Sequence, residues 1–366
     1  MAIRYATEDG EWYEESVIKN ATYTQYDGRL HYKVAIENLT PGESYVYKIG
    51  DIEDNLWSEP YSFTVASEAT EEFSFLGVTD PQSSEWSGGF EYYKNTLDTA
   101  FADNSDIDFM VSLGDMVERG HSYSEWEGYF DEVEGSAETI PHMAVVGNHE
   151  TRGDENTAVK YYTLMFNNPK NGKDALGSIT AEDVGADGKG VVNNFEGTVY
   201  SFDYGNTHFA VLNTASDYSA ASDAQKIVTE QAKWLDKDLA DSDKKWTIVL
   251  IHQGMYPAIT DRWNSRSALL SVIDKHNVDL VLQGQDHMVA RTYSMYANEI
   301  VATENPASVT KETGTVYTIL GSAGPKRYED VAEVPSYLAF LENMPKAQPT
   351  YSLFTVNDEK ISVTIK

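Results

Sequence analysis

Asp, Asn and His side chains recur in five short segments of this 366-residue chain, each directly after an apolar run. The segments are Thr79-Asp80-Pro81-Gln82, Gly114-Asp115, Gly147-Asn148-His149-Glu150, Ile251-His252 and Gly284-Gln285-Asp286-His287. Carboxylate and amide oxygens and imidazole nitrogens are the donors that a divalent metal prefers in proteins. Polar residues at the carboxyl ends of buried strands also lie where open α/β sheets bind their ligands. The sequence therefore predicts a metal site built from separate strand ends.

The elements that would position these segments alternate along the chain. The apolar runs predict strands over Phe73–Val78, Ile107–Leu113, Trp246–Leu250 and Val278–Leu282, with a shorter run over Met143–Val146. Helical patterns lie between them over Tyr92–Ala102, Ser124–Val133, Asp223–Asp241 and Ser265–His276. This alternation predicts a layered α/β architecture.

The ordered set of motifs resembles the calcineurin-like metallophosphoesterases, and within them the purple acid phosphatase-like branch. A Gly-Asp pair alone is a weak signal, whereas all the motifs in this order, each after an apolar run, are specific. The resemblance extends from about Phe73 to the carboxyl terminus and implies a two-sheet β-sandwich flanked by helices over residues 72–366. The alternating residues Tyr200–Tyr204 and His208–Leu212, joined by Gly205-Asn206, predict a hairpin in the second sheet.

Residues 1–68 predict a small all-β domain ahead of the catalytic domain, with alternation over Tyr32–Ile36 and Ser44–Ile49. Leu39–Tyr45 is similar to the LxPGxxY corner of fibronectin type III domains, in which the Tyr hydroxyl ties back to the preceding turn. Purple acid phosphatases carry such a sandwich. In that family Ile3–Thr7 would match the third strand, so the resemblance implies two earlier strands that this sequence does not contain.

The resemblance implies a role in metal binding for five of these residues. Asp115 would bridge two metal ions, while Asp80 and His287 would bind the first ion. Asn148 and His252 would bind the second ion. From the residues alone, Asp115 could instead cap the helix that follows it. The expected ions are divalent or trivalent manganese, iron or zinc.

The sequence departs from the family pattern at three positions. Gln285 stands where the fifth family motif has a metal-binding His, and a neutral Gln oxygen is a weak donor for zinc or iron. We therefore expect weaker binding of the second metal, or a preference for harder ions such as manganese. Gln82 and Glu118 stand where the family has a His or a Tyr ligand, so the tyrosinate that colours the purple enzymes is absent. Both glutamines either supply weak oxygen ligands or hydrogen-bond to metal-binding carboxylates or to water, and Asp286 would point away from Gln285 and His287.

The remaining polar residues of these motifs are candidates for substrate contacts. In the family, the His of the Gly-Asn-His-Glu motif faces the substrate, so His149 would stabilise the phosphoryl oxygens or protonate the leaving alkoxide. Asn148, His121 and Arg152 could also contact the substrate, and Glu150 would orient neighbouring groups. Three further histidines are predicted to be structural: His31, His208 and His276.

Composition excludes several classes of function. The chain has 59 acidic and 27 basic residues and a net charge of −32, which argues against nucleic acid as a partner. There are no cysteines, so disulfides, thiolate metal sites and Cys nucleophiles are excluded. No apolar run approaches the roughly 18–20 residues of a membrane span, and no signal peptide opens the sequence.

The function implied by the resemblance is hydrolysis of small phosphate esters by a metal-bound hydroxide. One alternative is a catalytically weakened member of the fold that binds a ligand, a cell-wall polymer or a partner, and Gln285 keeps this alternative open. Another is a phosphodiesterase with the same site. Analogy with secreted relatives predicts an extracellular or cell-surface location, and the absence of Cys fits a bacterial secreted protein. The natural substrate, the oligomeric state and the role of the predicted loop Asn167–Asn194 stay open.

Overall fold

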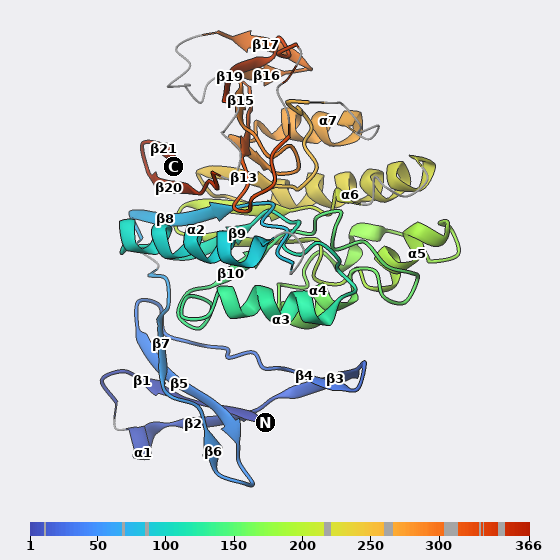
Figure 1. Cartoon of the computed structure of the whole chain (residues 1–366). Helices are drawn as coiled ribbons and strands as arrows, with labels where there is room; N and C mark the ends of the chain where they lie inside the picture. Colours follow the sequence, from blue (N-terminus) through green and yellow to red (C-terminus); the bar gives the residue numbers. More distant parts are fainter. Residues whose placement is uncertain are drawn as a thin grey trace.

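Two β-sheets packed face to face, with helices on their outer sides, form most of the molecule, and smaller sheets lie at its amino-terminal end (Figure 1). The computed structural model describes residues 1–366 except 11, 68–69, 85–87, 216–220, 260–265, 304–313, 329–330, 332 and 343–347. Within this described part, no helix is long and apolar enough to cross a membrane.

The first large sheet contains the strands that precede three of the five motif segments. Its order is β10-β9-β8-β20-β21. The bounds are β8 Glu72–Val78, β9 Phe109–Ser112, β10 His142–Ala144, β20 Ser352–Asn357 and β21 Ile361–Ile365. Strands β8, β9 and β10 are parallel to one another, so their carboxyl ends meet at one edge of the sheet. Strand β20 pairs antiparallel with β8 and brings the carboxyl-terminal residues beside the first strand of this sheet.

The second large sheet contains the strands that precede the other two segments, and its order is β11-β12-β13-β14-β18-β15-β19. The bounds are β11 Tyr200–Tyr204, β12 Thr207–Val211, β13 Trp246–Leu250, β14 Leu280–Gln283, β15 Val289–Thr292, β18 Val316–Leu320 and β19 Leu338–Glu342. Within this sheet, β12, β13, β14 and β18 form a parallel run in which each strand pairs with the next. The predicted hairpin is confirmed, because β11 and β12 are antiparallel and Gly205-Asn206 forms the turn between them.

A dry aromatic layer between the two sheets accounts for their packing. Phe75 stacks on Phe109 at 5.1 Å and on Phe354 at 4.4 Å between ring centroids, and Phe209 of the second sheet meets Phe75 edge-on at 5.5 Å. All four rings are buried. Offset and edge-to-face contacts of this kind stabilise aromatic clusters beyond the burial of their apolar area. The predicted two-sheet sandwich flanked by helices is confirmed.

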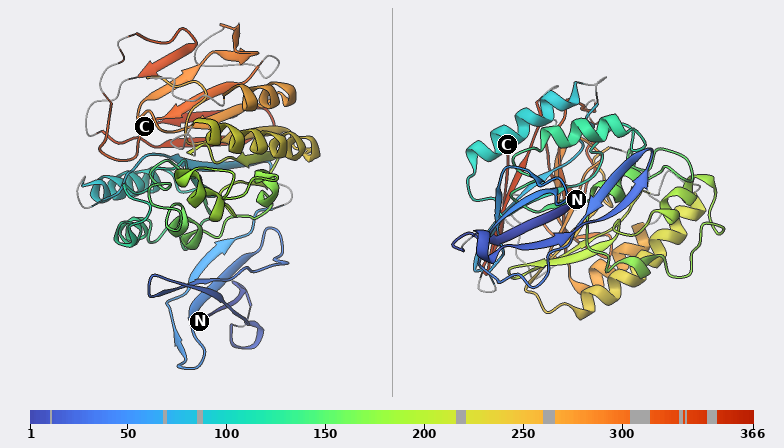
Figure 2. Two further views of the ribbon diagram at one scale, coloured as in Figure 1. Left: turned by 90° about the vertical axis from the view of Figure 1, so that its right-hand side faces the viewer. Right: turned by 90° about the horizontal axis from the view of Figure 1, so that it is seen from below.

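Helices cover the outer face of each sheet (Figure 2). They are α2 Gly89–Asp103 and α3 Tyr123–Glu132 on the first sheet, and α6 Ala221–Asp241 and α7 Arg266–His276 on the second. Tyr93 and Leu97 of α2 and Ile227 and Leu235 of α6 are buried in the helix-covered core. The four predicted helices therefore exist to within a few residues, except that Ser265 lies outside the described residues.

The prediction of a long loop over Asn167–Asn194 was wrong in part. After helix α4, Lys160–Met165, this stretch contains a short 3-10 helix, η1 Lys173–Leu176, and helix α5 Ala186–Asn193. Ala175, Val184 and Val191 are buried and hold the stretch against the rest of the chain. Its Gly, Asn and Asp content hid these short helices because tertiary packing, rather than intrinsic propensity, stabilises them.

The amino-terminal part is predominantly β-structure, as predicted. A five-stranded sheet contains β1 Ala2–Thr7, β2 Val17–Asn20, β5 Ser44–Asp51, β6 Leu56–Trp57 and β7 Tyr61–Thr64, with the short helix α1 Trp12–Glu15 after β1. A separate hairpin is formed by β3 Thr22–Tyr26 and β4 Arg29–Lys33, so the alternation predicted over Tyr32–Ile36 gives a strand that already ends at Lys33. The Tyr45 hydroxyl accepts a hydrogen bond from the Thr40 backbone N–H at 3.0 Å, which is the predicted corner. A second two-stranded sheet, β16 Ser294–Tyr296 and β17 Glu299–Ala302, lies at the far end of the molecule.

His208 of β12 lies between a carboxylate of β11 and one of helix α6, and these contacts make stability depend on pH. Its Nδ1 lies 2.7 Å from Asp203 Oδ1 and its Nε2 lies 2.9 Å from Asp238 Oδ2. Burial alone would lower the pKa of His208, but hydrogen bonds to Asp238 and Asp203 raise it above its ordinary value. Because the folded pKa is raised, the charged contacts stabilise the fold fully below the unfolded pKa of about 6.5 and are lost as pH rises through the folded pKa.

We predict that His208→Gln destabilises the chain most at about pH 5 and progressively less as pH rises above about 6.5, as measured by urea unfolding at several pH values. In an Asp203→Asn/Asp238→Asn background, the same substitution should have an effect that does not vary with pH. An equal loss of stability at every pH in the otherwise wild-type chain would contradict the predicted role of the two carboxylates.

Candidate metal centre

The ends of five parallel strands bring the predicted metal-binding segments together. Asp80 follows β8, Asp115 follows β9 and the Gly147–Glu150 segment follows β10. His252 follows β13, and the Gly284–His287 segment follows β14. The cluster therefore takes side chains from both sheets of the sandwich.

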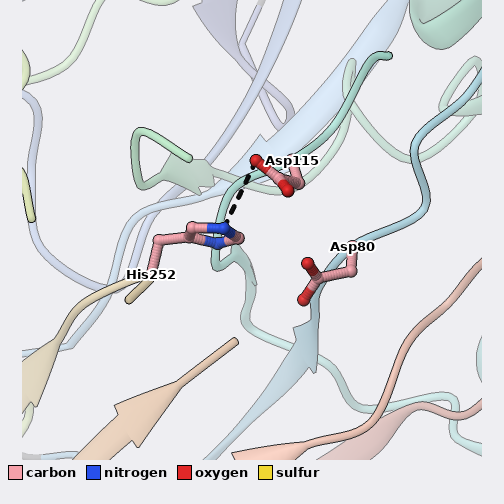
Figure 3. A group of neighbouring side chains, drawn as sticks. All are labelled: Asp80, Asp115 and His252. Atoms are coloured by element: carbon pink, nitrogen blue, oxygen red, sulfur yellow. Dashed lines mark ion pairs between the residues drawn. The ribbon is translucent and has the colours of Figure 1, made fainter. Parts of the chain in front are cut away.

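Asp80, Asp115 and His252 form the centre of this cluster (Figure 3). All three side chains are fully buried, and one potential ligand atom from each lies within 4.8 Å of those of the other two. His252 Nε2 lies 3.3 Å from Asp115 Oδ1. Two carboxylates at this separation repel each other unless a positive charge lies between them.

Asn148 lies on the Asp115 and His252 side of the cluster. Its Oδ1 is 3.2 Å from His252 Nε2. The other ring nitrogen of His252, Nδ1, donates a hydrogen bond to the Leu113 carbonyl at 2.6 Å, which fixes the ring orientation. The residues predicted for the second metal, Asp115, Asn148 and His252, are thus side by side.

His287 lies on the Asp80 side. Its Nδ1 donates to the Lys326 carbonyl at 3.0 Å, and its Nε2 lies 3.3 Å from Asp80 Oδ1. Both Nε2 and Asp80 Oδ1 are buried, and neither forms a hydrogen bond within the described part of the chain. Buried polar atoms without such partners are costly, and a cation between a carboxylate oxygen and an imidazole nitrogen would satisfy both.

The two glutamines that replace family ligands differ in their contacts. The side-chain amide of Gln82 donates to Asp115 Oδ2 at 3.2 Å and contacts His149 Nε2 at 3.0 Å, in agreement with the alternative that it hydrogen-bonds to a carboxylate. The backbone N–H of Gln285 donates to Asp80 Oδ2 at 2.9 Å, and its side-chain Oε1 is buried with no hydrogen-bond partner among the described residues. Asp286 accepts bonds from the backbone N–H groups of Ala258 and Ile259, so it points away from the cluster, as predicted.

The electrostatics of the cluster fit a bound cation. Burial alone would lower the pKa of His252, but the charges of Asp115 and Asp80 raise it to about 10. Burial would likewise raise the pKa of Asp115, yet His252 and His149 hold it well below its ordinary value. Without a metal ion, a proton on His252 offsets part of the negative charge of Asp115 and Asp80. Divalent metal ions would offset the same charge. Oxygen and imidazole donors suit manganese, iron or zinc.

The backbone is strained where the ligand side chains project. Asp80 has φ 52°, Asp115 has φ 52° and His287 has φ 52°, while Gln82 and Gln285 have φ of 44° and 73°. Left-handed conformations of non-glycine residues cost about 1–3 kcal/mol each and persist where surrounding structure enforces them, often at functional sites. Gly147 is required for another reason, because a Cβ there would lie 2.2 Å from the Asp115 backbone nitrogen.

Glu150 joins the second and third motifs through backbone hydrogen bonds. Its carboxylate accepts from the N–H groups of Asp115 at 2.8 Å, Met116 at 2.9 Å and Gly147 at 2.7 Å. Burial and the neighbouring Asp115 charge raise the pKa of Glu150 to about 7. These bonds fit the orienting role expected for this residue.

His149 is almost fully buried and is held by groups on both of its ring nitrogens. Nδ1 donates to the Glu118 carbonyl at 2.9 Å, and Nε2 accepts from Arg152 Nη2 at 3.0 Å. The Glu118 carboxylate, at the position of the family Tyr, pairs with Arg152 at 2.5 Å. Burial lowers the pKa of His149, and the charges of Arg152 and Lys326 act in the same direction against those of Asp115 and Glu118. His121 is exposed, and its Nδ1 donates to the Arg152 carbonyl at 3.1 Å.

The loop after β18 contributes to the site and was missed by sequence reasoning. Ser322 Oγ donates to the Asp80 carbonyl at 2.8 Å, and a Cβ at Gly324 would lie 2.1 Å from the Pro81 carbonyl oxygen. The Lys326 carbonyl holds His287, and the Lys326 charge acts on His149. A run of small residues, Gly321-Ser322-Ala323-Gly324, directly after an apolar strand is the signal that could have indicated a strand end at the site.

Comparison with known families supports this reading of the motifs. Residues 73–289 match the family model described as calcineurin-like phosphoesterase. Residues 2–65 match the one described as purple acid phosphatase, N-terminal domain.

Individual relatives are distant but cover most of the chain. A protein of Arabidopsis thaliana named "Probable inactive purple acid phosphatase 24" is 24% identical over 79% of this chain and 48% of its own length. Mouse acid phosphatase type 7 is 24% identical over 80% of this chain and 64% of its own length. The chain thus spans about half the length of the plant relative. The solved structure of purple acid phosphatase PPD1 from yellow lupin seeds covers 100% of this chain and 66% of its own, with a TM-score of 0.76 and 18% identity, which shows a shared fold.

We predict that the purified chain binds two manganese ions and that Gln285→His tightens the binding of the weaker one, because an imidazole is a better donor than a neutral amide oxygen. Metal content after dialysis and calorimetric titration measure this. Asp115→Asn should lower the affinity for both ions, whereas Asp106→Asn, an exposed carboxylate at the opposite end of β9, should leave it unchanged. Unchanged affinity and stoichiometry in Gln285→His would place Gln285 outside the ligand set.

Proposed function

Because the chain belongs to the calcineurin-like phosphoesterase family, we propose that it is a metal-dependent phosphohydrolase of small phosphate esters. The observation that carries this proposal is the convergence of Asp80, Asp115 and His252, all fully buried, at the carboxyl ends of strands from both sheets. Burial of two neighbouring carboxylates at this depth is unfavourable without a compensating cation.

We assign the ligands as the sequence predicts. Asp115 bridges two metal positions, Asp80 and His287 serve the first, and Asn148 and His252 serve the second. Gln285 is the candidate for an additional weak ligand through its buried Oε1. When bound, two such ions supply an acidified water as nucleophile and positive charge for the phosphoryl oxygens.

The chain's own groups then orient the substrate and its leaving group. His149, held between Glu118 and Arg152, faces the Asp115 side of the cluster, with its Nε2 3.5 Å from Asp115 Oδ2. Donation of a hydrogen bond to a phosphoryl oxygen, or of a proton to the leaving alkoxide, would require a proton on Nε2 and a turn of Arg152 from Nε2 toward the phosphate. Arg152 and Lys326 are cations whose charges lower the pKa of His149. They would also attract the phosphate ester at short range.

A second candidate function is binding without turnover. The neutral Gln285 in place of a ligand His favours it, and one similar plant protein carries the word inactive in its name. Loss of one imidazole weakens one metal position but leaves both carboxylates and two histidines, so hydrolysis remains the better supported function. Cleavage of phosphodiesters at the same site is a variant of the first proposal that differs in substrate alone.

Domain division and location remain predictions. We place an amino-terminal β-domain, fibronectin III-like in its Tyr45 corner, at residues 1–68 and the catalytic domain at residues 72–366, with support from the two family matches. An extracellular or cell-surface location and a bacterial source are kept as proposals by analogy.

We predict that Asp115→Asn lowers the rate of nitrophenyl phosphate hydrolysis by about 100-fold or more, equivalent to about 2.7 kcal/mol, because the bridge between the metals loses its charge. Rates with added manganese are compared with those of Asp106→Asn, which should match wild type. Faster hydrolysis of bis-(nitrophenyl) phosphate than of the monoester would identify a diesterase. If wild type and Asp115→Asn are equally slow in every metal while the chain still binds two ions, the binding function would replace hydrolysis.

We also predict that Lys326→Ala raises KM for nitrophenyl phosphate by about tenfold, or about 1.4 kcal/mol, with a smaller change in kcat, because a cation that attracts the phosphate is lost. The matched control is Lys360→Ala, in the exposed turn between β20 and β21. A KM equal to that of Lys360→Ala would contradict this role of the ammonium group, since Lys326→Ala keeps the backbone carbonyl that bonds His287.

A further inference from the structure

A cavity of about 300 Å³ lies between the β3–β4 hairpin and the segments from α4 to β11, apart from the metal-binding cluster. Its lining includes His31 and Lys33 from the hairpin and Lys160, Lys170, Asn194 and Glu196 from the segments opposite. Figure 1 shows the hairpin reaching from the amino-terminal part to the underside of α3 and α4. No residue of the candidate metal centre lines this cavity.

The walls of the cavity are fixed by contacts between the hairpin and the larger part of the molecule. The Lys33 ammonium group donates to the Thr163 and Phe166 carbonyls at the end of α4, at 2.6 and 2.5 Å. Tyr161 Oη donates to Asp27 Oδ2 at 2.8 Å, and the Arg29 guanidinium stacks on the Tyr123 ring at 3.8 Å. The hairpin is thus docked by several independent contacts, which makes the cavity a built feature of the fold.

Positive charge collects in this cavity although the chain as a whole carries −32. Among the described lining residues, Glu196 is the one acid, and it forms an ion pair with Lys170. Lys33 is bonded to neutral carbonyls, and the described contact of the Lys160 ammonium group is with the Tyr26 ring. Two ammonium groups therefore line the cavity without a carboxylate partner of their own in the part of the chain that the structure describes.

The neighbouring groups respond to this charge. Burial lowers the pKa of Lys33 to about 8, with Lys170 and Lys160 acting in the same direction and Glu196 against them. Burial also lowers the pKa of His31, and Arg29, Lys33 and Lys160 add to this effect. His31 Nε2 is buried with no hydrogen-bond partner among the described residues. An anion in the cavity would relieve the repulsion among these positive groups.

We propose that the cavity binds a phosphate group, either as free phosphate or carried on a small polar molecule. Two lysines and an imidazole match the charge and the several acceptor oxygens of a phosphate better than those of a single carboxylate. Lys33 uses two of its three N–H donors on carbonyls and keeps the third for a ligand. A volume of about 300 Å³ is at the lower end for small-molecule sites, which suits phosphate with a body no larger than one sugar ring.

The test is an NMR titration of the intact chain with inorganic phosphate, glucose 6-phosphate and glucose, which follows the ring resonance of His31. His31→Gln identifies that resonance. This readout is local to the cavity, so it does not depend on whether the metal centre also binds phosphate or on the proposed hydrolysis. We expect saturable shifts with either phosphate compound, and about tenfold weaker binding in Lys160→Gln. Lys173→Gln, an exposed lysine in η1 that does not line the cavity, should bind as wild type does.

The outcomes distinguish free phosphate from an organic phosphate as the ligand and identify the results that would overturn the proposal. Saturation with inorganic phosphate supports a free-phosphate site, and saturation with glucose 6-phosphate alone supports an organic phosphate as ligand. Shifts with glucose equal to those with glucose 6-phosphate would overturn the proposal, as would equal affinities in Lys160→Gln and Lys173→Gln. An absence of any His31 shift with both phosphate compounds in the folded wild-type chain would also overturn it.

Discussion

Two carboxylates with no exposed surface, Asp80 and Asp115, lie within one small cluster. The other residues of the site are arranged to compensate their negative charge. Desolvation of a carboxylate costs several kcal/mol, so both groups require compensation by charge and by hydrogen bonds. Part of it comes from the protein, since His252 and His287 each place a nitrogen 3.3 Å from one of these carboxylates. Asp80 Oδ1 has no hydrogen-bond partner among the described residues, and the proposed cation would supply a partner for it.

The sandwich supplies the rigidity that such a cluster demands. Three of the proposed ligands, Asp80, Asp115 and His287, lie in the left-handed region, and this strain persists only where the strands on either side cannot relax. Phe209 of the second sheet packs edge-on against Phe75 of the first, beside the buried stack of Phe75, Phe109 and Phe354, and this packing holds the ends of β8 and β9 toward those of β13 and β14. Glu150 then locks the loops after β9 and β10 to each other through backbone N–H groups, which sets where Asn148 and His149 project.

Sequence reasoning located the strand ends because their signal is local. An apolar run followed by Asp, Asn or His is visible without any contact information, and so is the Tyr45 corner. The loop Gly321–Tyr328 was missed because its contributions are a hydroxyl, a backbone carbonyl and small residues, and it carries no Asp, Asn or His of the kind that marked the other strand ends. The helices η1 and α5 were missed because three buried apolar residues, separated by polar ones, hold them by tertiary packing. The choice between ligand and hydrogen-bond donor for Gln82 required atomic positions that spacing cannot supply.

The charge of the chain and the location of its cations together constrain how it can recognise phosphate. A net charge of −32 repels anions at a distance, but salt at physiological ionic strength screens this repulsion beyond about 8 Å. Recognition is therefore decided at short range, where Arg152 and Lys326 act on His149 and where Lys33 and Lys160 line the hairpin cavity. Positive charge kept local in an acidic protein favours small phosphate compounds over polyanions, because an extended polyanion must also contact the acidic surface around the site. Under the proposed function, the same separation of local and global charge would let this acidic chain accept a small phosphate ester and would disfavour nucleic acid.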